Sequence, residues 1–236
     1  MGIQVSEKIM LLNLDSRLRD IWSKVFCNRI FRPADKQAII ESLKVCKKVL
    51  DQHGIVFWLE AGTLLGVIRE GDIIEDDNDG DISFWLKDGY RISKLKDKFN
   101  EYGFYLRDLG SKFELIDNTS MKCLCMFANY RYKGYVVKVK VLCFIQIIFI
   151  INDFFKTSFL EKHLWYVISK FDCLYYDNFV RCKEDMIGEF SYINFNDLMY
   201  RIPERPQDYL EYKYGDWKTN RVNDKGIKKR LKEVMA

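Results

Sequence analysis

Two short β-rich runs flank a compact segment that contains a turn, a helix and an acidic loop. Residues 55–60 (IVFWLE) form the first run and residues 81–86 (DISFWL) form the second. Between them come a glycine-containing turn at residues 61–63 (AGT), a helical stretch (LLGVIRE) and a cluster of acids. This pattern predicts strand, turn, short helix, loop and strand. A chain with this order folds as layers of strands and helices and not as a helical bundle.

Helix and strand signals continue on both sides of this segment. Apolar residues recur at helical spacing through residues 34–52 and a His-Gly pair follows, which predicts an amphipathic helix. Residues 95–102 predict another helix. Residues 121–130 and 135–144 predict two strands joined by a Lys-Gly turn, as in a hairpin.

The chain shows no linker, internal repeat or shift in composition that would mark a domain boundary. Its 236 residues suffice for one large domain with a hydrophobic core. We therefore predict a single α+β domain over residues 1–236, with a mixed sheet flanked by helices. Within it we expect an N-terminal helical region at residues 1–53, a core at 54–155 and a helical C-terminal region at 156–236.

Composition narrows the class of protein. Hydrophobic residues make up 48% of the chain, which excludes a disordered protein. The net charge of +4 is too small to indicate a nucleic-acid partner. Seven cysteines without the spacing of a disulfide framework, and no secretory signal, predict a reducing cytoplasmic location. A single Cys-x-Cys pair with only two histidines argues against a structural zinc site.

Two features bear on membranes. The apolar run at residues 141–151 (VLCFIQIIFII) is shorter than the roughly 20 residues that span a bilayer, so it predicts a buried strand or core helix. The opening MGIQVS matches the myristoylation pattern M-G-x-x-x-[ST], in which Gly2 accepts the acyl chain. Peripheral membrane contact through Gly2 is thus an alternative to a purely cytoplasmic protein.

The acidic loop at residues 73–84 (IIEDDNDGDISF) suggests a cation site, because carboxylates this close together repel one another. A calcium loop of the EF-hand type fails on register. With Gly80 at loop position 6, position 1 is Glu75 and position 12 is Leu86, where a bidentate Glu is required. The loop is therefore not an EF-hand.

A second interpretation uses Asp79 and Asp81. Residues two apart on a strand project to one face, so both carboxylates can hold a hard divalent ion such as Mg²⁺ or Mn²⁺. Upstream, Gly62 and Thr63 precede a helix, where backbone N–H groups and a hydroxyl can hold a phosphate. A phosphate turn followed by a metal loop indicates metal-dependent phosphoryl transfer.

Residues 57–84 (FWLEAGTLLGVIREGDIIEDDNDGDISF) resemble the LicD/fukutin family and its pattern W-L-x-x-G-[ST]-L-L-G-x-x-R-x-G-x-I-x-x-D-x-D-x-D. Near the end, residues 203–217 (PERPQDYLEYKYGDW) are similar to the same family's second motif. The resemblance implies a nucleotidyltransferase fold of the polymerase-β type. It also implies transfer of a phosphorylated small alcohol, such as phosphocholine or ribitol phosphate, from a CDP-activated donor to a glycan.

Carried over by position, the family pattern assigns roles to individual residues. Asp79 and Asp81 would be metal ligands and catalytic, with Asp77 as a third acid. Gly62 and Thr63 would face the donor's phosphates, and Arg69 would neutralise the departing nucleotide phosphate. The tyrosines of the second motif, with Trp217, are expected to pack in the core near the active site rather than to line it.

The sequence departs from the family pattern at several places. Gly80 replaces an apolar residue between the two ligands, which we expect to add backbone freedom. A later strand of the fold usually supplies another carboxylate, but the strand at residues 135–144 carries Lys138 and Lys140 instead. Asp117 or Asp153 would then fill that role. Lys138 and Lys140 either contact substrate phosphate or form the wet face of a strand.

Three functions remain open at this point. The first is transfer of a phospho-alcohol from a CDP-linked donor to a sugar hydroxyl. The second is transfer of a nucleotide to a small molecule or protein with the same ions. The third is a catalytically impaired binding protein, which the missing strand carboxylate motivates.

Overall fold

The computed structural model describes residues 35–219, except residues 76, 111, 121, 133–135, 142–144, 146, 150, 152–157, 171–174 and 183. For two strands, β6 (Val136–Val141) and β7 (Tyr175–Cys182), it describes the backbone alone. Gly2 and Asp153 therefore lie outside the described residues.

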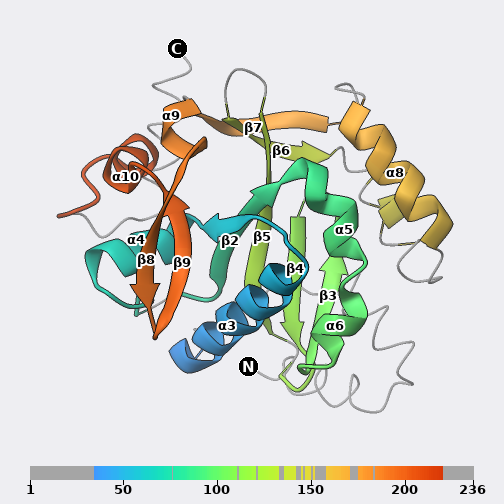
Figure 1. Ribbon diagram of the computed structural model, residues 1–236, viewed down its shortest axis with the longest axis horizontal. Coiled ribbons are helices and arrows are strands. Elements are labelled where there is room, and N and C mark those ends of the chain that lie inside the picture. Colours follow the sequence, from blue (N-terminus) through green and yellow to red (C-terminus); the bar gives the residue numbers. More distant parts are fainter. Residues whose placement is uncertain are drawn as a thin grey trace, which may run out of the picture.

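Seven strands form one mixed sheet (Figure 1). Five of them follow the order β1-β2-β5-β4-β3, with bounds Phe57–Leu59, Gly80–Trp85, Cys123–Tyr132, Lys112–Asp117 and Phe104–Asp108. β6 pairs with the end of β5, and β7 pairs with β6. β2 and β5 run parallel while the other pairs are antiparallel. The antiparallel β5–β6 pair confirms the predicted hairpin, and the mixed sheet with helices confirms the α+β class.

Helix α3 (Lys36–Gln52) confirms the predicted amphipathic helix and packs across the sheet (Figure 1). Its apolar stripe is buried, and the Asp35 side chain caps its first turn by accepting from Gln37 N. A Cβ at Gly80 would lie 3.0 Å from a methyl carbon of Leu43. Gly80 is thus needed for the close contact of β2 with α3. Its φ lies outside the left-handed region, so the close contact with α3, and not an unusual backbone conformation, favours glycine here.

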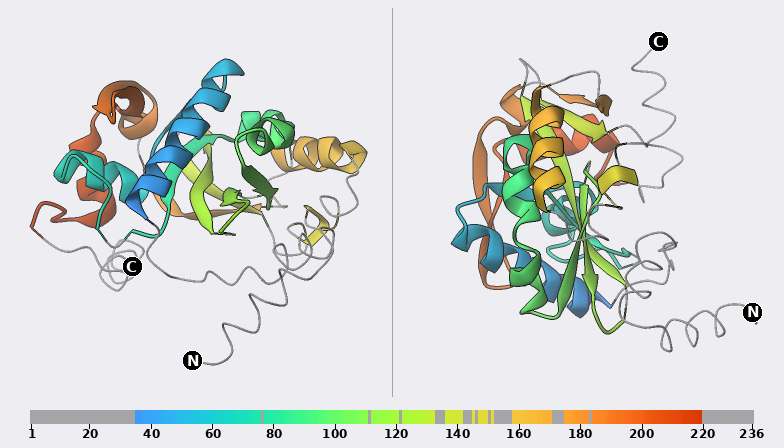
Figure 2. Two further views of the ribbon diagram at one scale, coloured as in Figure 1. Left: turned by 90° about the horizontal axis from the view of Figure 1, so that it is seen from below. Right: turned by 90° about the vertical axis from the view of Figure 1, so that its right-hand side faces the viewer.

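The helices α5 (Gly89–Ser93), α6 (Lys96–Asn100) and α8 (Ser158–Lys170) cover the same face of the sheet as α3 (Figure 2). Phe99 of α6 contacts the Phe127 ring of β5, and Trp165 of α8 stacks on Phe113 of β4. Because side chains alternate along a strand, residues next to Phe113 and Phe127 point to the opposite face.

The structure joins β1 to β2 through helix α4 (Ala61–Arg69). The turn predicted at residues 61–63 is instead the start of this helix, whose first residue, Ala61, has a left-handed φ of 45°. After α4, Gly71 has a φ of 71° and the chain crosses back over the helix. A Cβ at Gly66 would lie 2.5 Å from the carbonyl oxygen of Asp72, so only glycine permits this crossing.

The C-terminal part of the chain holds strands as well as the predicted helices. β8 (Phe190–Phe195) and β9 (Leu198–Pro203) form a separate two-stranded sheet beside β1. The short α9 (Glu184–Ile187) precedes it, and α10 (Pro206–Tyr214) follows it. α10 starts at a proline and stops at Gly215, whose φ is 72°. Within the described residues no helix is long and apolar enough to cross a membrane.

Candidate functional site

Asp81 is tied to the start of α4 by three hydrogen bonds. Its carboxylate Oδ2 accepts from Gly62 N at 3.2 Å, and its own backbone N–H donates to Thr63 Oγ1 at 2.7 Å. Its carbonyl oxygen accepts from Glu60 N at 3.0 Å. These bonds join the start of β2 to the N-terminus of α4. They place the Asp81 carboxylate at the positive end of the helix dipole.

Asp77 joins Asp81 at this helix start. A Cβ built on Gly62 would lie 2.7 Å from Asp77 Oδ2 and 3.5 Å from Asp81 Oδ2. The two carboxylates thus converge on the bare backbone of Gly62, where an added side chain would displace Asp77. Asp77 Oδ2 is buried and accepts no hydrogen bond, while Oδ1 accepts from Asn78 N at 3.0 Å. A buried carboxylate oxygen with no donor is the arrangement that a cation would satisfy.

The electrostatics of this pair also favour a cation. Burial, and next the negative charge of Asp81, raise the pKa of Asp77 to about 6 from an ordinary value of 3.8. A divalent ion between the two carboxylates would remove both effects, because it replaces lost solvation and screens the repulsion. The residues present therefore fit Mg²⁺ or Mn²⁺, with Asp77 and Asp81 as the protein ligands.

The pKa of Asp77 makes stability depend on pH. Because the folded pKa is raised, the folded state binds more protons than the unfolded state between pH 3.8 and 6. Stability without metal should therefore fall as the pH rises from about 3.8 to about 6, and the penalty should be complete above about 6. Asp77→Asn should remove this slope and stabilise the metal-free protein by about 1–2 kcal/mol at pH 7.5, given the partial exposure of Asp77. Urea unfolding of both proteins across this interval and up to pH 7.5 measures this, and equal slopes would contradict it.

Gly62→Ala tests whether the convergence matters. The atom that the new methyl group meets is the end of the Asp77 side chain, which can swing away, so the protein should still fold. The two carboxylates would then separate, and we expect kcat/KM to fall about 100-fold. A urea unfolding curve for Gly62→Ala shows whether the added methyl group has changed stability as well as turnover. Normal turnover in Gly62→Ala would show that the pair does not act together.

Asp79 precedes β2 and is partly exposed. Its charge acts on Cys123: burial chiefly, and then the charges of Glu114 and Asp79, hold the pKa of that thiol above its usual range. Across the described ranges, no group of three or more His, Cys, Asp or Glu side chains is placed to hold a metal ion. The structure thus brings Asp77 and Asp81 together and leaves the part of Asp79 in metal binding as a prediction.

The other predicted residues lie at different distances from the pair. Thr63 is fully buried, and its hydroxyl oxygen already accepts from Asp81 N. Arg69 lies at the far end of α4, about 10 Å from Gly62 along the axis, where its guanidinium donates to the Trp217 carbonyl at 3.3 Å. Lys138 and Lys140 are placed in β6 by their backbone, but their side chains lie outside the description.

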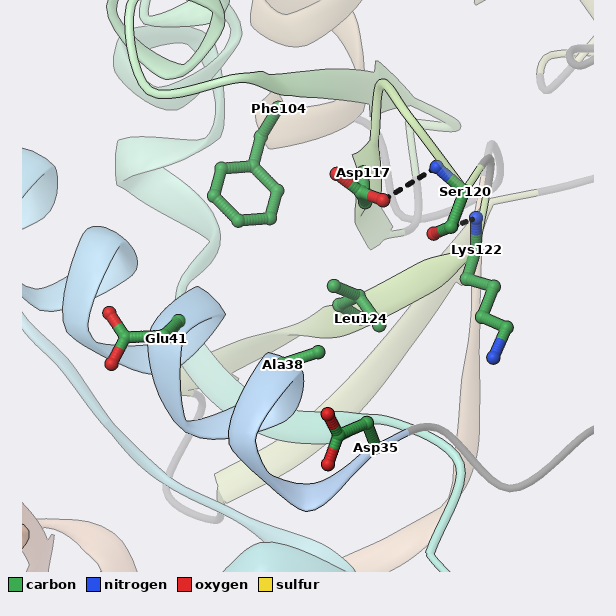
Figure 3. Close-up of a pocket in the computed structure, with 8 residues that line it drawn as sticks. All are labelled: Asp35, Ala38, Glu41, Phe104, Asp117, Ser120, Lys122 and Leu124. Atoms are coloured by element: carbon green, nitrogen blue, oxygen red, sulfur yellow. Dashed lines mark hydrogen bonds between the residues drawn. The ribbon is translucent and has the colours of Figure 1, made fainter.

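Asp117, considered as a third acid, lies on the face of the sheet that α3 covers. It lines a pocket of about 350 Å³ with Asp35 and Glu41 (Figure 3), and its carboxylate accepts from Ser120 N at 2.6 Å. The Asp81 side chain points to the opposite face, because Gly80 before it faces α3. Asp117 is therefore separated from Asp81 by the sheet.

A buried acid that the sequence analysis missed, Glu60, connects the first motif with the second. Glu60 is 1% exposed and directly precedes α4. Its carboxylate accepts from Trp58 Nε1 at 3.2 Å, Tyr130 OH at 3.0 Å and Lys213 Nζ at 2.6 Å, and also from Tyr209 OH. The sequence held one signal for this role. Glu60 ends an apolar strand, and an acid that is buried with such a strand requires a partner.

This network explains the tyrosine-rich helix. Tyr209 is fully buried against Glu60 and Trp217 is 6% exposed, which confirms the expected packing of these two residues. Tyr212 is 40% exposed and is the exception. Through the bond from Lys213, α10 holds Glu60, the residue directly before α4 and 153 residues earlier in the chain.

The chain is similar in sequence to several known proteins. An uncharacterised protein of Rickettsia prowazekii (strain Madrid E) is 26% identical over 144 residues, covering 60% of this chain and 49% of that protein. The ribitol 5-phosphate transferases FKRP of Mus musculus and Homo sapiens are each 41% identical over 64 residues, covering 27% of this chain and 13% of the transferase. The chain spans about half the length of the Rickettsia protein and far less of the transferases.

The family model described as the LicD/FKTN/FKRP nucleotidyltransferase domain matches residues 54–205. The match covers more than half of the chain and includes β1, α4, the acidic loop and β2, which together form the Asp77–Asp81 site. The chain therefore belongs to the LicD/FKTN/FKRP family.

Proposed function

We propose that the protein is a Mg²⁺- or Mn²⁺-dependent phosphotransferase of the LicD type. It would move a phosphorylated small alcohol, such as ribitol phosphate or phosphocholine, from a CDP-activated donor to a glycan hydroxyl. Family membership and the identity with ribitol 5-phosphate transferases over 64 residues support the reaction class. The observation that carries the proposal is the buried, unpartnered Asp77 Oδ2 beside Asp81 at the bare backbone of Gly62.

The residues of this site have distinct tasks in the proposed reaction. Asp77 and Asp81 would hold the divalent ion, which supplies charge stabilisation to the donor's phosphates when it is bound. Gly62 provides backbone close enough for both carboxylates to approach. Thr63 and Glu60 act on position, because their hydrogen bonds fix the backbone of Asp81. Glu60 in turn is held by Lys213 of α10.

A transfer assay tests the proposal. The chain is incubated with Mn²⁺, a sugar acceptor and, in separate reactions, CDP-ribitol, CDP-choline or CDP-glycerol, and the products are identified by mass. The expected product carries the phospho-alcohol, with release of CMP. Attachment of CMP to the acceptor would favour nucleotidyl transfer instead.

A thermal-shift titration addresses the case of a binding protein without catalysis. A phosphotransferase should be stabilised by Mn²⁺, and further by a CDP-alcohol in the presence of Mn²⁺. Stabilisation by both, without product in any assay, would favour the binding protein. Absence of any divalent-dependent stabilisation would reject the metal site itself.

A further inference from the structure

A row of side chains crosses the sheet from Asp81 to its far edge. The register pairs Asp81 of β2 with Met126 of β5, Met126 with Glu114 of β4, and Glu114 with Arg107 of β3. Paired residues on neighbouring strands point to the same face, so these four side chains form one line. Lys112 is two residues before Glu114 and belongs to the same face.

This face is the one opposite α3, α5, α6 and α8. Asp108, next to Arg107, accepts from Trp165 of α8, and Phe113, next to Glu114, stacks on the same tryptophan. Arg107 and Glu114 must then point away from α8, toward the side on which Asp81 lies. The carboxylate pair and the charged residues of β3 and β4 therefore share one surface of the sheet.

Two cations and one carboxylate lie on this surface, on the strands beyond Asp81 and Met126. Arg107 and Lys112 both contact Glu114, at one carboxylate oxygen each, and the Lys112 distance is 2.5 Å. Burial alone would raise the pKa of Glu114, but Arg107 and Lys112 together outweigh it and hold the pKa below its usual range. One carboxylate thus contacts two cations, one at each oxygen.

Lys112 is the cation of this group that reaches toward Asp81. Its Nζ lies 3.6 Å from Met126 Sδ, and Met126 is the direct neighbour of Asp81 on the adjoining strand, roughly 5 Å away. The Lys112 side chain is 30% exposed, whereas the side chains of Arg107 and Glu114 are 7% exposed. An ammonium group has three donors, so the bond to Glu114 leaves Lys112 able to bind an anion.

We propose that Lys112 binds a phosphate group of the substrate at the edge of the Asp77–Asp81 site. This assignment rests on the proposed function: Lys112 would bind the diphosphate of a nucleoside-diphosphate donor. A donor diphosphate held beside Asp81 would extend over several ångströms, and Lys112 lies in line to meet it across β5. Arg107 is a positioning residue, because it shares the charge of Glu114 and so releases the Lys112 ammonium for the ligand.

Binding of CDP in the presence of Mn²⁺, measured by calorimetry on the full chain, tests this assignment. Lys112→Met should weaken CDP binding roughly 10- to 100-fold, because a charge-assisted contact is lost. Lys112→Arg should keep affinity within about threefold, since the charge remains. Lys44→Met is the matched control: Lys44 is 35% exposed and paired with Glu41 at 2.9 Å, but lies on α3, across the sheet. Cytidine, which has no phosphate, should bind Lys112→Met and the wild type equally.

The possible outcomes distinguish a failure of the Lys112 assignment from a failure of the proposed function. Wild-type affinity in Lys112→Met, with binding abolished in Asp81→Asn, would overturn the role of Lys112 and leave the metal-dependent transferase intact. Equal weakening in Lys112→Met and Lys44→Met would also overturn it, as a general charge effect. No Mn²⁺-dependent CDP binding by the wild type would overturn the proposed function and the Lys112 role together.

Discussion

Asp81→Asn is expected to lower kcat/KM at least about a thousandfold while the protein remains folded. The amide oxygen of Asn can still accept from Gly62 N, and the backbone bonds to Thr63 and Glu60 do not involve the side chain. What is lost is one negative charge of the pair that would hold the divalent ion, a change that removes several kcal/mol of transition-state stabilisation. Steady-state transfer kinetics with Mn²⁺, and an unfolding curve for each protein, measure the two effects separately.

Glu75→Gln provides the matched control for Asp81→Asn. Glu75 belongs to the same acidic loop but is exposed, so loss of its charge should leave kcat/KM within about twofold. A large loss in both variants would mean that the loop acts through its summed charge. Full activity in Asp81→Asn would exclude Asp81 as a ligand.

Lys213→Met is expected to have the largest effect on stability. Glu60 is 1% exposed, and Lys213 at 2.6 Å is its counter-ion. Burial alone would lower the pKa of Lys213, but the Glu60 carboxylate and the nearby tyrosines outweigh it and hold the pKa well above its usual value. Removal of one partner of a buried ion pair leaves the other charge uncompensated, so we expect a loss of about 3–5 kcal/mol in the free energy of unfolding. Urea unfolding at pH 7 measures it.

The double variant Glu60→Gln with Lys213→Met distinguishes a lost charge partner from lost packing. Gln keeps an oxygen for Trp58 and the tyrosines but needs no counter-ion, so the double variant should recover most of the stability lost in Lys213→Met. Lys218→Met, at an exposed lysine in the same part of the chain, should change stability by less than about 0.5 kcal/mol. A double variant as unstable as Lys213→Met would attribute the loss to packing.

Local signals predicted the elements that depend on nearby residues. The spacing of apolar residues located α3, and two β-rich runs located the β5–β6 hairpin. Each of these is decided within about 20 residues of sequence. The order of strand, short helix, acidic loop and strand was also predicted from the sequence.

Features that depend on distant residues were beyond the sequence. Parallel pairing of β2 with β5 joins residues more than 40 positions apart, and nothing local specifies it. Asp77 and Asp81 meet at Gly62 because of the path that the loop takes back over α4. The alternation of side chains along a strand could not predict this, because β2 begins only at Gly80. The ion pair of Glu60 and Lys213 spans 153 residues.

The contact between Gly80 and Leu43 sets a practical limit on how this protein can be shortened. The family match begins at residue 54 and ends at 205, yet α3 lies before it and Lys213 lies after it. A fragment trimmed to the matched region would lose the helix that backs the strand of Asp81 and the lysine that neutralises Glu60. The part of the chain needed for folding therefore extends beyond the family match at both ends.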